Sequence, residues 1–282
     1  MNTKIWKCRD FTFDPAVRGE IMGILNVTPD SFSDGGKFST LDAAVAQAGN
    51  LIEEGAAILD IGGESTRPGA ADVSVEEELK RTQPVIQELV RQFPGICLSI
   101  DTSKPEVASD AMETGAHVIN DVTGFRNAEM IRVAADTGAG AVVMHMQGSP
   151  ETMQQSPGYE NVVHDVKTFF ETQLERMLAS GVASDAIVFD PGIGFGKTLQ
   201  HNLELLHRIE ELETGNRPLL LGVSRKSFIG KLIQSDTMEE RSWPTVGITA
   251  YTAEKGVRLH RVHEVRPNLE SLRMIEAILQ SI

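Results

Sequence analysis

Seven polar or ionisable residues stand where short apolar runs of the chain end. They are Asn26, Asp101, Asn120, Asp190, Lys226, Arg261 and His263. Carboxylate and amide oxygens accept hydrogen bonds from N–H groups, whereas lysine, arginine and histidine donate hydrogen bonds and attract anions. Brought together on one rim, this set would form a binding site. A single polar residue at such a position is often a helix N-cap, so the elements that carry the seven residues decide the interpretation.

Eight short apolar runs alternate with segments that have helical spacing. The runs lie at residues 21–25, 57–61, 96–100, 117–119, 141–144, 187–189, 219–221 and 257–259. They are apolar on successive residues, which is typical of parallel strands covered on both faces rather than of half-exposed antiparallel strands. Spacing and capping residues predict helices at 41–54, 75–93, 105–114, 127–137, 162–180, 203–212, 227–233 with an extension to 253, and 269–279.

This alternation predicts an α/β fold, a single (β/α)8 TIM barrel, with residues 1–282 forming one domain. Residues 1–20 precede the first strand, and the alternation of Trp6, Phe11 and Phe13 predicts a short N-terminal β extension that closes the barrel bottom. A doubly wound sheet usually has fewer strands and an early dinucleotide-binding fingerprint, which the sequence lacks. Since the carboxyl ends of barrel strands form the active site, we expect the seven polar residues to line one mouth.

The overall charge excludes some partners. The chain has 282 residues, with 26 Lys+Arg against 40 Asp+Glu, which gives a formal net charge of −14. This acidic surplus disfavours nucleic acid and anionic membranes as partners, because phosphate binding requires concentrated lysine and arginine. No apolar run approaches the ~20 residues of a spanning helix, and the first residues lack the apolar core of a signal peptide. The two cysteines, Cys8 and Cys97, do not form a disulfide framework. We therefore expect a cytoplasmic enzyme that binds anions only in a local basic pocket.

The sequence contains no transition-metal spacing and no nucleophile-elbow motif. The glycine-rich stretch 192–198 is similar to a phosphate-binding loop, but the position where that loop needs its first glycine holds Pro191. Its glycines are predicted to allow close backbone approach and a sharp turn instead. The loops after the first two strands, at 27–36 and 62–69, are rich in small and polar residues. We predict that they are lids that close over a substrate.

The sequence resembles the bacterial dihydropteroate synthases, a family of pterin-binding enzymes, over nearly its whole length. The matching segments are MGILNVTPDSFSDGG at 22–36, GGESTRPG at 62–69, IDTSKP at 100–105, DPGIGFGK at 190–197, SRKS at 224–227 and RVH at 261–263. The resemblance implies the barrel fold inferred above and a transferase of folate biosynthesis. That family joins 4-aminobenzoate to 6-hydroxymethyl-7,8-dihydropterin diphosphate and releases diphosphate. It also implies Mg²⁺ as the cofactor, a homodimer, and inhibition by sulfonamides.

The family's site residues map onto this sequence motif by motif. Those implied to hold the pterin are Asp101, Asn120, Met144, Asp190 and Lys226. Those implied to hold the diphosphate are Asn26, Arg261 and His263, with Asn26 also contacting Mg²⁺. Those implied to frame 4-aminobenzoate are Thr66, Arg67, Pro68, Phe195 and Ser227. The implied lid residues are Phe32 and Asp34 on the first loop, and Thr66 and Arg67 on the second.

The chemistry of the side chains agrees with these roles. A pterin edge presents a row of N–H donors, for which carboxylates and an amide are suitable acceptors, and Lys226 can donate to the carbonyl side. A diphosphate needs cations and oriented donors, which a basic cluster with Mg²⁺ provides. An aromatic amine is neutral and nucleophilic at pH 7, so no activated nucleophile is required. We hypothesise a dissociative substitution in which diphosphate leaves first.

Two alternatives stay open at this point. A methyltransferase domain that carries methyltetrahydrofolate to a corrinoid would share the barrel and the pterin acceptors, but would not need residues 66–68, Arg261 or His263. A non-catalytic pterin-binding paralogue is expected to have lost lid residues or the diphosphate cluster, and the sequence retains both. The segment 240–251 departs from the family pattern, which affects the expected dimer surface more than the chemistry.

Overall fold

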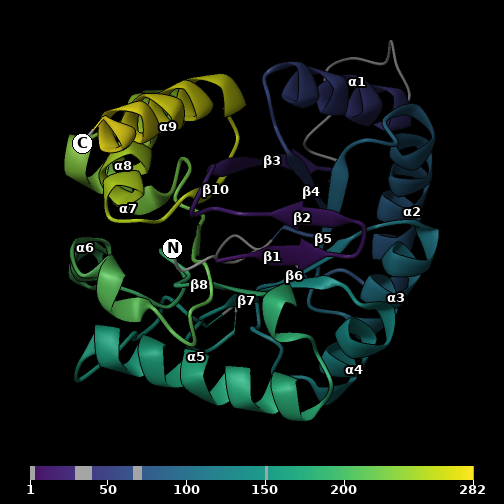
Figure 1. The fold of residues 1–282 in the computed structure, drawn as a ribbon, viewed down its shortest axis with the longest axis horizontal. Coiled ribbons are helices and arrows are strands. Elements are labelled where there is room, and N and C mark those ends of the chain that lie inside the picture. Colours follow the sequence, from purple (N-terminus) through teal and green to yellow (C-terminus); the bar gives the residue numbers. More distant parts are fainter. Residues whose placement is uncertain (1–3, 29–39, 66–71, 150–151, 282) are drawn as a thin grey trace.

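The computed structural model describes residues 4–28, 40–65, 72–149 and 152–281, and its centre is a parallel eight-stranded sheet rolled into a barrel (Figure 1). Its strands are β3 (Glu20–Asn26), β4 (Ile58–Gly62), β5 (Cys97–Asp101), β6 (Val118–Asp121), β7 (Gly140–Met144), β8 (Ile187–Asp190), β9 (Leu220–Leu221) and β10 (Leu259–Val262). They pair in the order β8–β7–β6–β5–β4–β3–β10–β9, and a parallel bridge from Phe189 to Leu219 joins the two edges. The predicted TIM barrel is confirmed.

Helices cover the outside of this barrel (Figure 1). They are α1 (Thr40–Glu53), α2 (Val75–Gln92), α3 (Pro105–Thr114), α4 (Ala128–Thr137), α5 (Val162–Ala179), α6 (Leu199–His207), α7 (Ser227–Ile233), α8 (Ser242–Glu254) and α9 (Val265–Gln280). Short 3-10 turns are η2 (Ser184–Ala186), η3 (Ile209–Leu212) and η4 (Glu239–Arg241). Each strand of the barrel is thus separated from the next by at least one helix.

Local sequence explains where several helices begin. Ser74 caps α2, because its side chain accepts a 3.2 Å hydrogen bond from Glu77 N–H. Pro105 occupies the first turn of α3, where its missing N–H has no partner to lose. The helix predicted at 203–212 begins earlier, at Leu199 after the cap residue Thr198, and its last part is the separate turn η3.

The last strand differs from its prediction. The apolar run at 257–259 predicted a strand there, but β10 spans Leu259–Val262. Arg261 forms ion pairs inside the barrel with Asp60 and Asp101. The strand therefore contains an interior charge, which a search for apolar runs passes over.

Side chains inside the barrel form two tiers, because successive side chains point to opposite faces of a strand. The apolar tier takes one residue from each strand: Met22, Ile58, Cys97, Val118, Val142, Val188, Leu220 and Leu259. The polar tier lies two residues further along each chain segment: Ile24, Asp60, Ser99, Asn120, Met144, Asp190, Gly222 and Arg261. Residues between the tiers, such as Leu59, Leu98 and Ile119, pack outward against the helices. The barrel is therefore sealed by apolar packing at its amino end and polar toward its carboxyl end.

A short antiparallel hairpin packs against the apolar tier. It consists of β1 (Trp6–Cys8) and β2 (Phe11–Phe13), and it lies across the front of the barrel in Figure 1. Trp6 is fully buried, and its Nε1 donates a 2.9 Å hydrogen bond to Ala186 O. The predicted N-terminal β extension is thus confirmed, and it contacts the end of the barrel opposite the polar tier.

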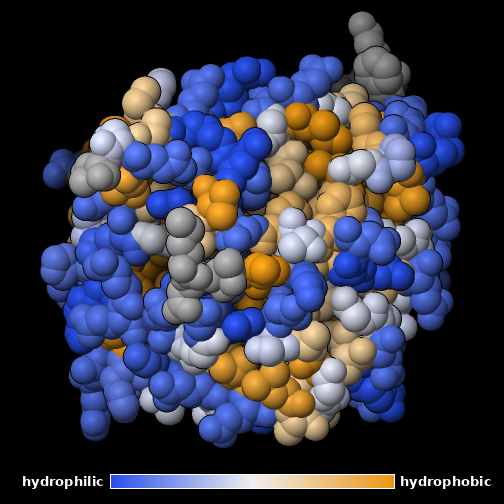
Figure 2. All heavy atoms as spheres, viewed as in Figure 1, coloured by the Kyte–Doolittle hydropathy of each residue, from blue (hydrophilic) through white to orange (hydrophobic). Residues whose placement is uncertain are grey.

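The face of the molecule that Figure 2 shows is largely hydrophilic, as the charge of the chain leads us to expect. Figure 2 shows the face that carries the hairpin, where hydrophobic residues form small groups among hydrophilic ones. None of the helices in the described part of the chain combines the length and apolar character that crossing a membrane requires.

Candidate active site

The polar tier holds a buried ion-pair network centred on Asp60. Arg261 donates from Nε to Asp60 Oδ2 and from Nη2 to Asp101 Oδ2, each at 2.6 Å. Asp60 also accepts from Ser99 Oγ at 2.5 Å and from Asn120 Nδ2 at 3.0 Å. The side chain of Asp60 is fully buried, whereas 20% of the Arg261 side chain is exposed. The guanidinium group is therefore the part of this pair that a ligand can reach.

Burial changes the acidity of the carboxyl groups in this network. It raises the pKa of Asp101 to about 7, an effect that Arg261 opposes and Asp60 reinforces. Burial likewise raises the pKa of Asp190, whose Oδ1 accepts a 2.7 Å hydrogen bond from Gly192 N–H. Burial alone would lower the pKa of Arg261, but the nearby carboxylates raise it, so the guanidinium stays charged.

Asn26 and Asp101 stand on either side of Gly62, at the carboxyl ends of neighbouring strands. The register pairs Asn26 with Gly62 and Gly62 with Asp101. A Cβ atom at position 62 would lie 3.5 Å from Asn26 Oδ1 and 3.9 Å from Asp101 Oδ2, so glycine leaves space between these side chains. Asp101 Oδ1 is buried and has no hydrogen-bond partner within the described residues. Because buried polar atoms are normally paired, this oxygen is a candidate acceptor for a ligand.

His263 lies two residues beyond Arg261, next to Ser224. Its Nδ1 is 3.0 Å from Ser224 Oγ, and its backbone N–H donates to the same oxygen at 3.2 Å. Beside them, Arg225 and Glu264 form an ion pair of 2.8 Å. These contacts tie the segment after β9 to the segment after β10, so they hold His263 at the mouth of the barrel.

Lys226 and Phe195 meet where the segments after β9 and β8 lie next to each other around the barrel. Lys226 Nζ lies 4.4 Å from the centre of the Phe195 ring and donates a 2.5 Å hydrogen bond to Ile193 O. Burial lowers the pKa of Lys226 to about 8, although Asp190 favours its charged form. Ser227, the next residue, begins α7 and is exposed. The ammonium group thus lies over an aromatic face, near enough to Asp190 for that carboxylate to favour its charged form.

Lys197 anchors the glycine-rich loop behind Phe195. Its Nζ lies 3.0 Å from His145 Nδ1 and donates to Gly192 O at 3.0 Å and to Phe195 O at 2.9 Å. Only 3% of Lys197 is exposed. Gly192 has a φ of +63°, and a Cβ atom there would lie 1.9 Å from His145 O. The predicted close backbone approach is confirmed, and the lysine of this motif is structural rather than a phosphate ligand.

An apolar cluster completes one wall of the site. It consists of Val122, Met144, Met146 and Met153, with Phe195 packed against them. Methionine sulfur is polarizable and adapts to flat aromatic surfaces. Met144 belongs to the polar tier, so this apolar wall borders the hydrogen-bonding groups directly.

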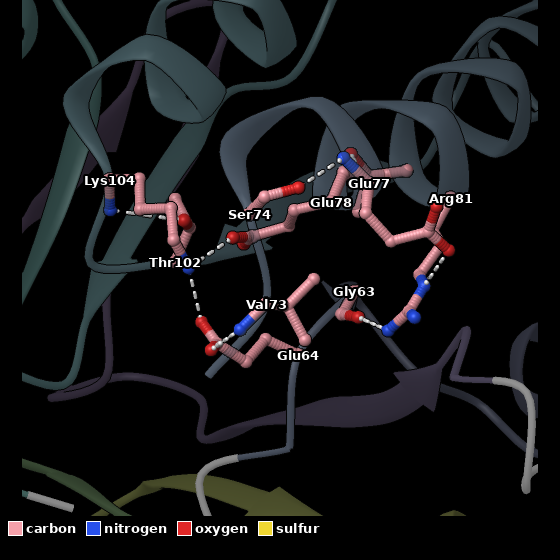
Figure 3. A network of polar contacts seen from close by, with 10 residues as sticks. Gly63, Glu64, Val73, Ser74, Glu77, Glu78, Arg81, Thr102 and Lys104 are labelled. Atoms are coloured by element: carbon pink, nitrogen blue, oxygen red, sulfur yellow. Dashed lines mark hydrogen bonds and ion pairs between the residues drawn. The ribbon is translucent and has the colours of Figure 1, made fainter. Parts of the chain in front are cut away.

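A second network lies at the end of β4 (Figure 3). Lys104 Nζ donates to Glu64 Oε2 at 2.5 Å and to Glu78 Oε2 at 2.8 Å. Glu64 Oε1 accepts a 2.9 Å hydrogen bond from Val73 N–H, and Arg81 donates to Gly63 O at 2.9 Å. These contacts fix the residues after β4 against the start of α2 and the segment after β5.

The structure gathers most of the predicted site residues at one end of the barrel. Asp101, Asn120, Asp190 and Arg261 are joined through hydrogen bonds or close charges, and Lys226 faces the same carboxylates. Five predicted residues lie outside the described residues: Phe32, Asp34, Thr66, Arg67 and Pro68.

Sequence reasoning missed four residues that organise this site: Asp60, Ser99, Lys197 and Ser224. Asp60 and Ser99 face each other in register on β4 and β5, and both belong to the polar tier. Counting two residues on from each apolar-tier position would have found them. Lys197 and Ser224 follow β8 and β9 in irregular segments, where no sequence period predicts the direction of a side chain.

Comparison with known proteins identifies the family to which this chain belongs. The family model described as pterin binding enzyme matches residues 22–263. Dihydropteroate synthase of Escherichia coli K12 is 46% identical over 261 residues, which are 93% of this chain and 92% of that protein. The Synechocystis dihydropteroate synthase is 43% identical over 94% of this chain and 92% of its own length.

Solved structures agree with the sequence relatives. A Yersinia pestis dihydropteroate synthase in a sulfonamide complex has a TM-score of 0.91 and 43% identity, covering 98% of this chain and 99% of its own. A Xanthomonas albilineans dihydropteroate synthase with 4-aminobenzoic acid has a TM-score of 0.92 and 41% identity, covering 99% of both chains. The chain therefore belongs to the pterin-binding enzymes. Within them it belongs to the dihydropteroate synthases, which are transferases of folate biosynthesis.

Proposed function

We propose that this chain condenses 4-aminobenzoate with 6-hydroxymethyl-7,8-dihydropterin diphosphate at the carboxyl end of its barrel, giving 7,8-dihydropteroate and diphosphate. The observation that carries the proposal is the polar tier. In this tier and at the strand end just beyond it, a buried row of acceptors, Asn120, Asp190 and Asp101, borders two cations, Arg261 and Lys226. Few small molecules match both parts, and a dihydropterin diphosphate does.

The pterin would occupy the acceptor row. Charge-assisted hydrogen bonds are stronger than neutral ones, so carboxylates at Asp101 and Asp190 suit the N–H groups of the pterin edge. The unpartnered Asp101 Oδ1 would receive one of these hydrogen bonds. Lys226 would leave Ile193 O and donate to the pterin carbonyl, and Met144 would pack against the flat ring.

The diphosphate would lie toward Asn26, Arg261 and His263. Arg261 donates hydrogen bonds from Nε and from one Nη2 hydrogen to carboxylates, so three of its five N–H donors are left for phosphate oxygens. The described residues contain no group of three or more His, Cys, Asp or Glu that could hold a metal ion. Mg²⁺ commonly keeps its waters and takes oxygens from substrate phosphates. The single amide oxygen of Asn26 therefore fits an ion that arrives with the diphosphate, where it would neutralise charge on the phosphate oxygens.

4-Aminobenzoate would bind on the outer side of the pterin. Phe195 offers a ring face and Ser227 an exposed hydroxyl at the start of α7. Thr66, Arg67 and Pro68 would complete this subsite, and Phe32 and Asp34 would act from the first loop. These five assignments rest on the sequence motifs alone.

The reaction would be a dissociative substitution. The carbon–oxygen bond at the pterin methylene breaks, and diphosphate leaves with the bonding electron pair. The amine nitrogen of 4-aminobenzoate then bonds to that carbon and loses one proton. Arg261 and His263 would stabilise the departing charge, each well-placed donor contributing roughly 3 kcal/mol. The carboxylates of Asp101 and Asp190 would stabilise the positive charge that the pterin carries in between.

An assay of diphosphate release by the purified chain, with and without 4-aminobenzoate, tests the proposal. A synthase releases diphosphate faster with 4-aminobenzoate and forms one dihydropteroate for each diphosphate. A methyltransferase domain or a non-catalytic paralogue forms no dihydropteroate, and that outcome would overturn the proposal. The cytoplasmic location and the homodimer stay predictions from the sequence, to be tested by cell fractionation and by light scattering.

A further inference from the structure

Asp60 is the least accessible charged group of the site. Its side chain is fully buried, so it does not touch a ligand itself. It nevertheless accepts hydrogen bonds from three polar-tier or neighbouring side chains: Ser99 at 2.5 Å, Asn120 at 3.0 Å and Arg261 at 2.6 Å. A buried carboxylate stays charged only where such partners compensate its desolvation.

Asp60 fixes which way the Asn120 amide points. An ionised carboxylate only accepts hydrogen bonds, so the Asn120 group that faces Asp60 Oδ2 must be its NH₂. The amide oxygen then points away from Asp60 and is available as an acceptor. Without the Asp60 charge, the amide could turn over and present donors to the pterin edge, where a donor is the wrong partner.

The same oxygen of Asp60 also fixes the Arg261 guanidinium. Asp60 Oδ2 accepts from Nε, while Asp101 accepts from Nη2, so two contacts define the plane of the group. An arginine side chain loses rotamer freedom when it is held in one geometry, and these contacts remove that freedom before a ligand arrives. The remaining N–H donors are thereby aimed at the place where we put the diphosphate.

We propose that Asp60 is a positioning residue that sets the orientation of both Asn120 and Arg261, and so couples recognition of the pterin to recognition of the diphosphate. The inference rests on the proposed function for the identity of the two ligand parts. It adds a residue that contacts neither part. Its physical basis is that a single carboxylate oxygen is shared by one group from each side of the site.

Asp60→Asn tests this proposal, because it keeps the shape of the side chain and removes its charge. We expect kcat/KM for the pterin diphosphate to fall about 30-fold, which corresponds to about 2 kcal/mol at 1.36 kcal/mol per tenfold change. The KM for 4-aminobenzoate should stay within threefold. Binding measured by calorimetry should weaken about 30-fold for inorganic diphosphate and also for 6-hydroxymethylpterin.

Asp121→Asn is the matched control. Asp121 is also fully buried, and it accepts three hydrogen bonds of 2.7 to 2.8 Å from Thr123 and Phe125, none of which belongs to the site. Both variants should lower the thermal midpoint by a similar amount, but only Asp60→Asn should weaken both ligands. Equal losses of activity in the two variants would assign Asp60 a merely structural role and overturn the proposal.

A double-mutant cycle with Arg261→Lys makes the coupling explicit. Lysine has no planar guanidinium for Asp60 to orient, so Asp60→Asn should weaken diphosphate binding less than threefold in that background. A loss that stays about 30-fold in both backgrounds would contradict the proposed contact. A wild-type chain that binds both ligands without forming dihydropteroate would refute the proposed function, while these binding measurements would still decide the role of Asp60.

Discussion

Lys197→Met is the perturbation whose consequence follows most directly from the structure. Lys197 Nζ contacts His145 Nδ1 at 3.0 Å and the carbonyl oxygens of Phe195, Gly192 and His145 at 2.9, 3.0 and 3.2 Å. Methionine has a similar length but no donor, so three buried carbonyls lose a hydrogen-bond partner. The segment after β7 and the loop after β8 then lose the hydrogen bonds through which Lys197 joins them.

The change in the free energy of unfolding is the difference between the cost of unpaired carbonyls and the gain from not burying an ammonium group. Each unpaired buried carbonyl costs about 1–3 kcal/mol, and removal of the buried ammonium regains several kcal/mol of desolvation. We expect a net destabilisation of about 3 kcal/mol, and at roughly 1.7 °C per kcal/mol for a chain of 282 residues the thermal midpoint should fall about 5 °C. Because burial lowers the pKa of Lys197 well below its usual value, the ammonium is costly to bury, which keeps the net loss modest.

Activity provides the second measurement for this variant. The loop that Lys197 holds carries Phe195, so kcat/KM for 4-aminobenzoate should fall about 10- to 100-fold, as a displacement of about 1 Å commonly causes. Binding of 6-hydroxymethylpterin should change much less. Lys80→Met, an exposed change on α2, is the control and should alter neither property. A Lys197→Met enzyme with wild-type melting and wild-type kinetics for 4-aminobenzoate would refute this reasoning.

Two further predictions concern charged groups. Burial lowers the folded-state pKa of Lys226 to about 8 from 10.5, so kcat/KM for the pterin substrate should decline above pH 8 as the donor is lost. The free energy of unfolding should change in the opposite direction to kcat/KM. Between pH 8 and 10.5 the unfolded chain binds more protons at this lysine than the folded chain does, so the stability of the fold rises with pH in that window. Lys226→Arg should remove the decline in kcat/KM, and a decline at an unchanged pH would contradict the assignment. Lys104→Met should destabilise the chain by about 3–5 kcal/mol in urea unfolding, because Glu78 would stay buried without its cation. Adding Glu78→Gln should recover part of that loss, and failure to recover any would argue against the network.

The strands and helices of the barrel could be predicted from the sequence better than the polar contacts inside it. Apolar runs and capping residues predict the barrel because most strand residues are apolar, and a run tolerates a single polar residue such as Asp60 or Ser99. The last strand was misplaced because Arg261 makes its interior face charged. A one-dimensional pattern records burial of apolar groups, and the last run stopped where two polar residues, His260 and Arg261, follow each other.

Some residues of the site could likewise be predicted from the sequence, and others could not. Residues at strand ends, such as Asp101 and Asn120, could be predicted because a barrel brings all such ends to one mouth. Asp60 and Lys197 could not, because their roles depend on contacts across the barrel, with Arg261 in one case and His145 in the other. Those contacts join residues 201 and 52 positions apart, a separation at which no local pattern predicts a pair.

The central claim is that the buried acceptors of the polar tier hold the pterin while diphosphate leaves and 4-aminobenzoate takes its place. The most direct test measures diphosphate and dihydropteroate in the same reaction for the wild-type chain and for Asp190→Ala, with circular dichroism to verify that both are folded. We predict equal amounts of the two products from the wild-type chain and neither product from folded Asp190→Ala. Near-normal diphosphate release by that variant, or diphosphate released by the wild-type chain without dihydropteroate, would contradict the account.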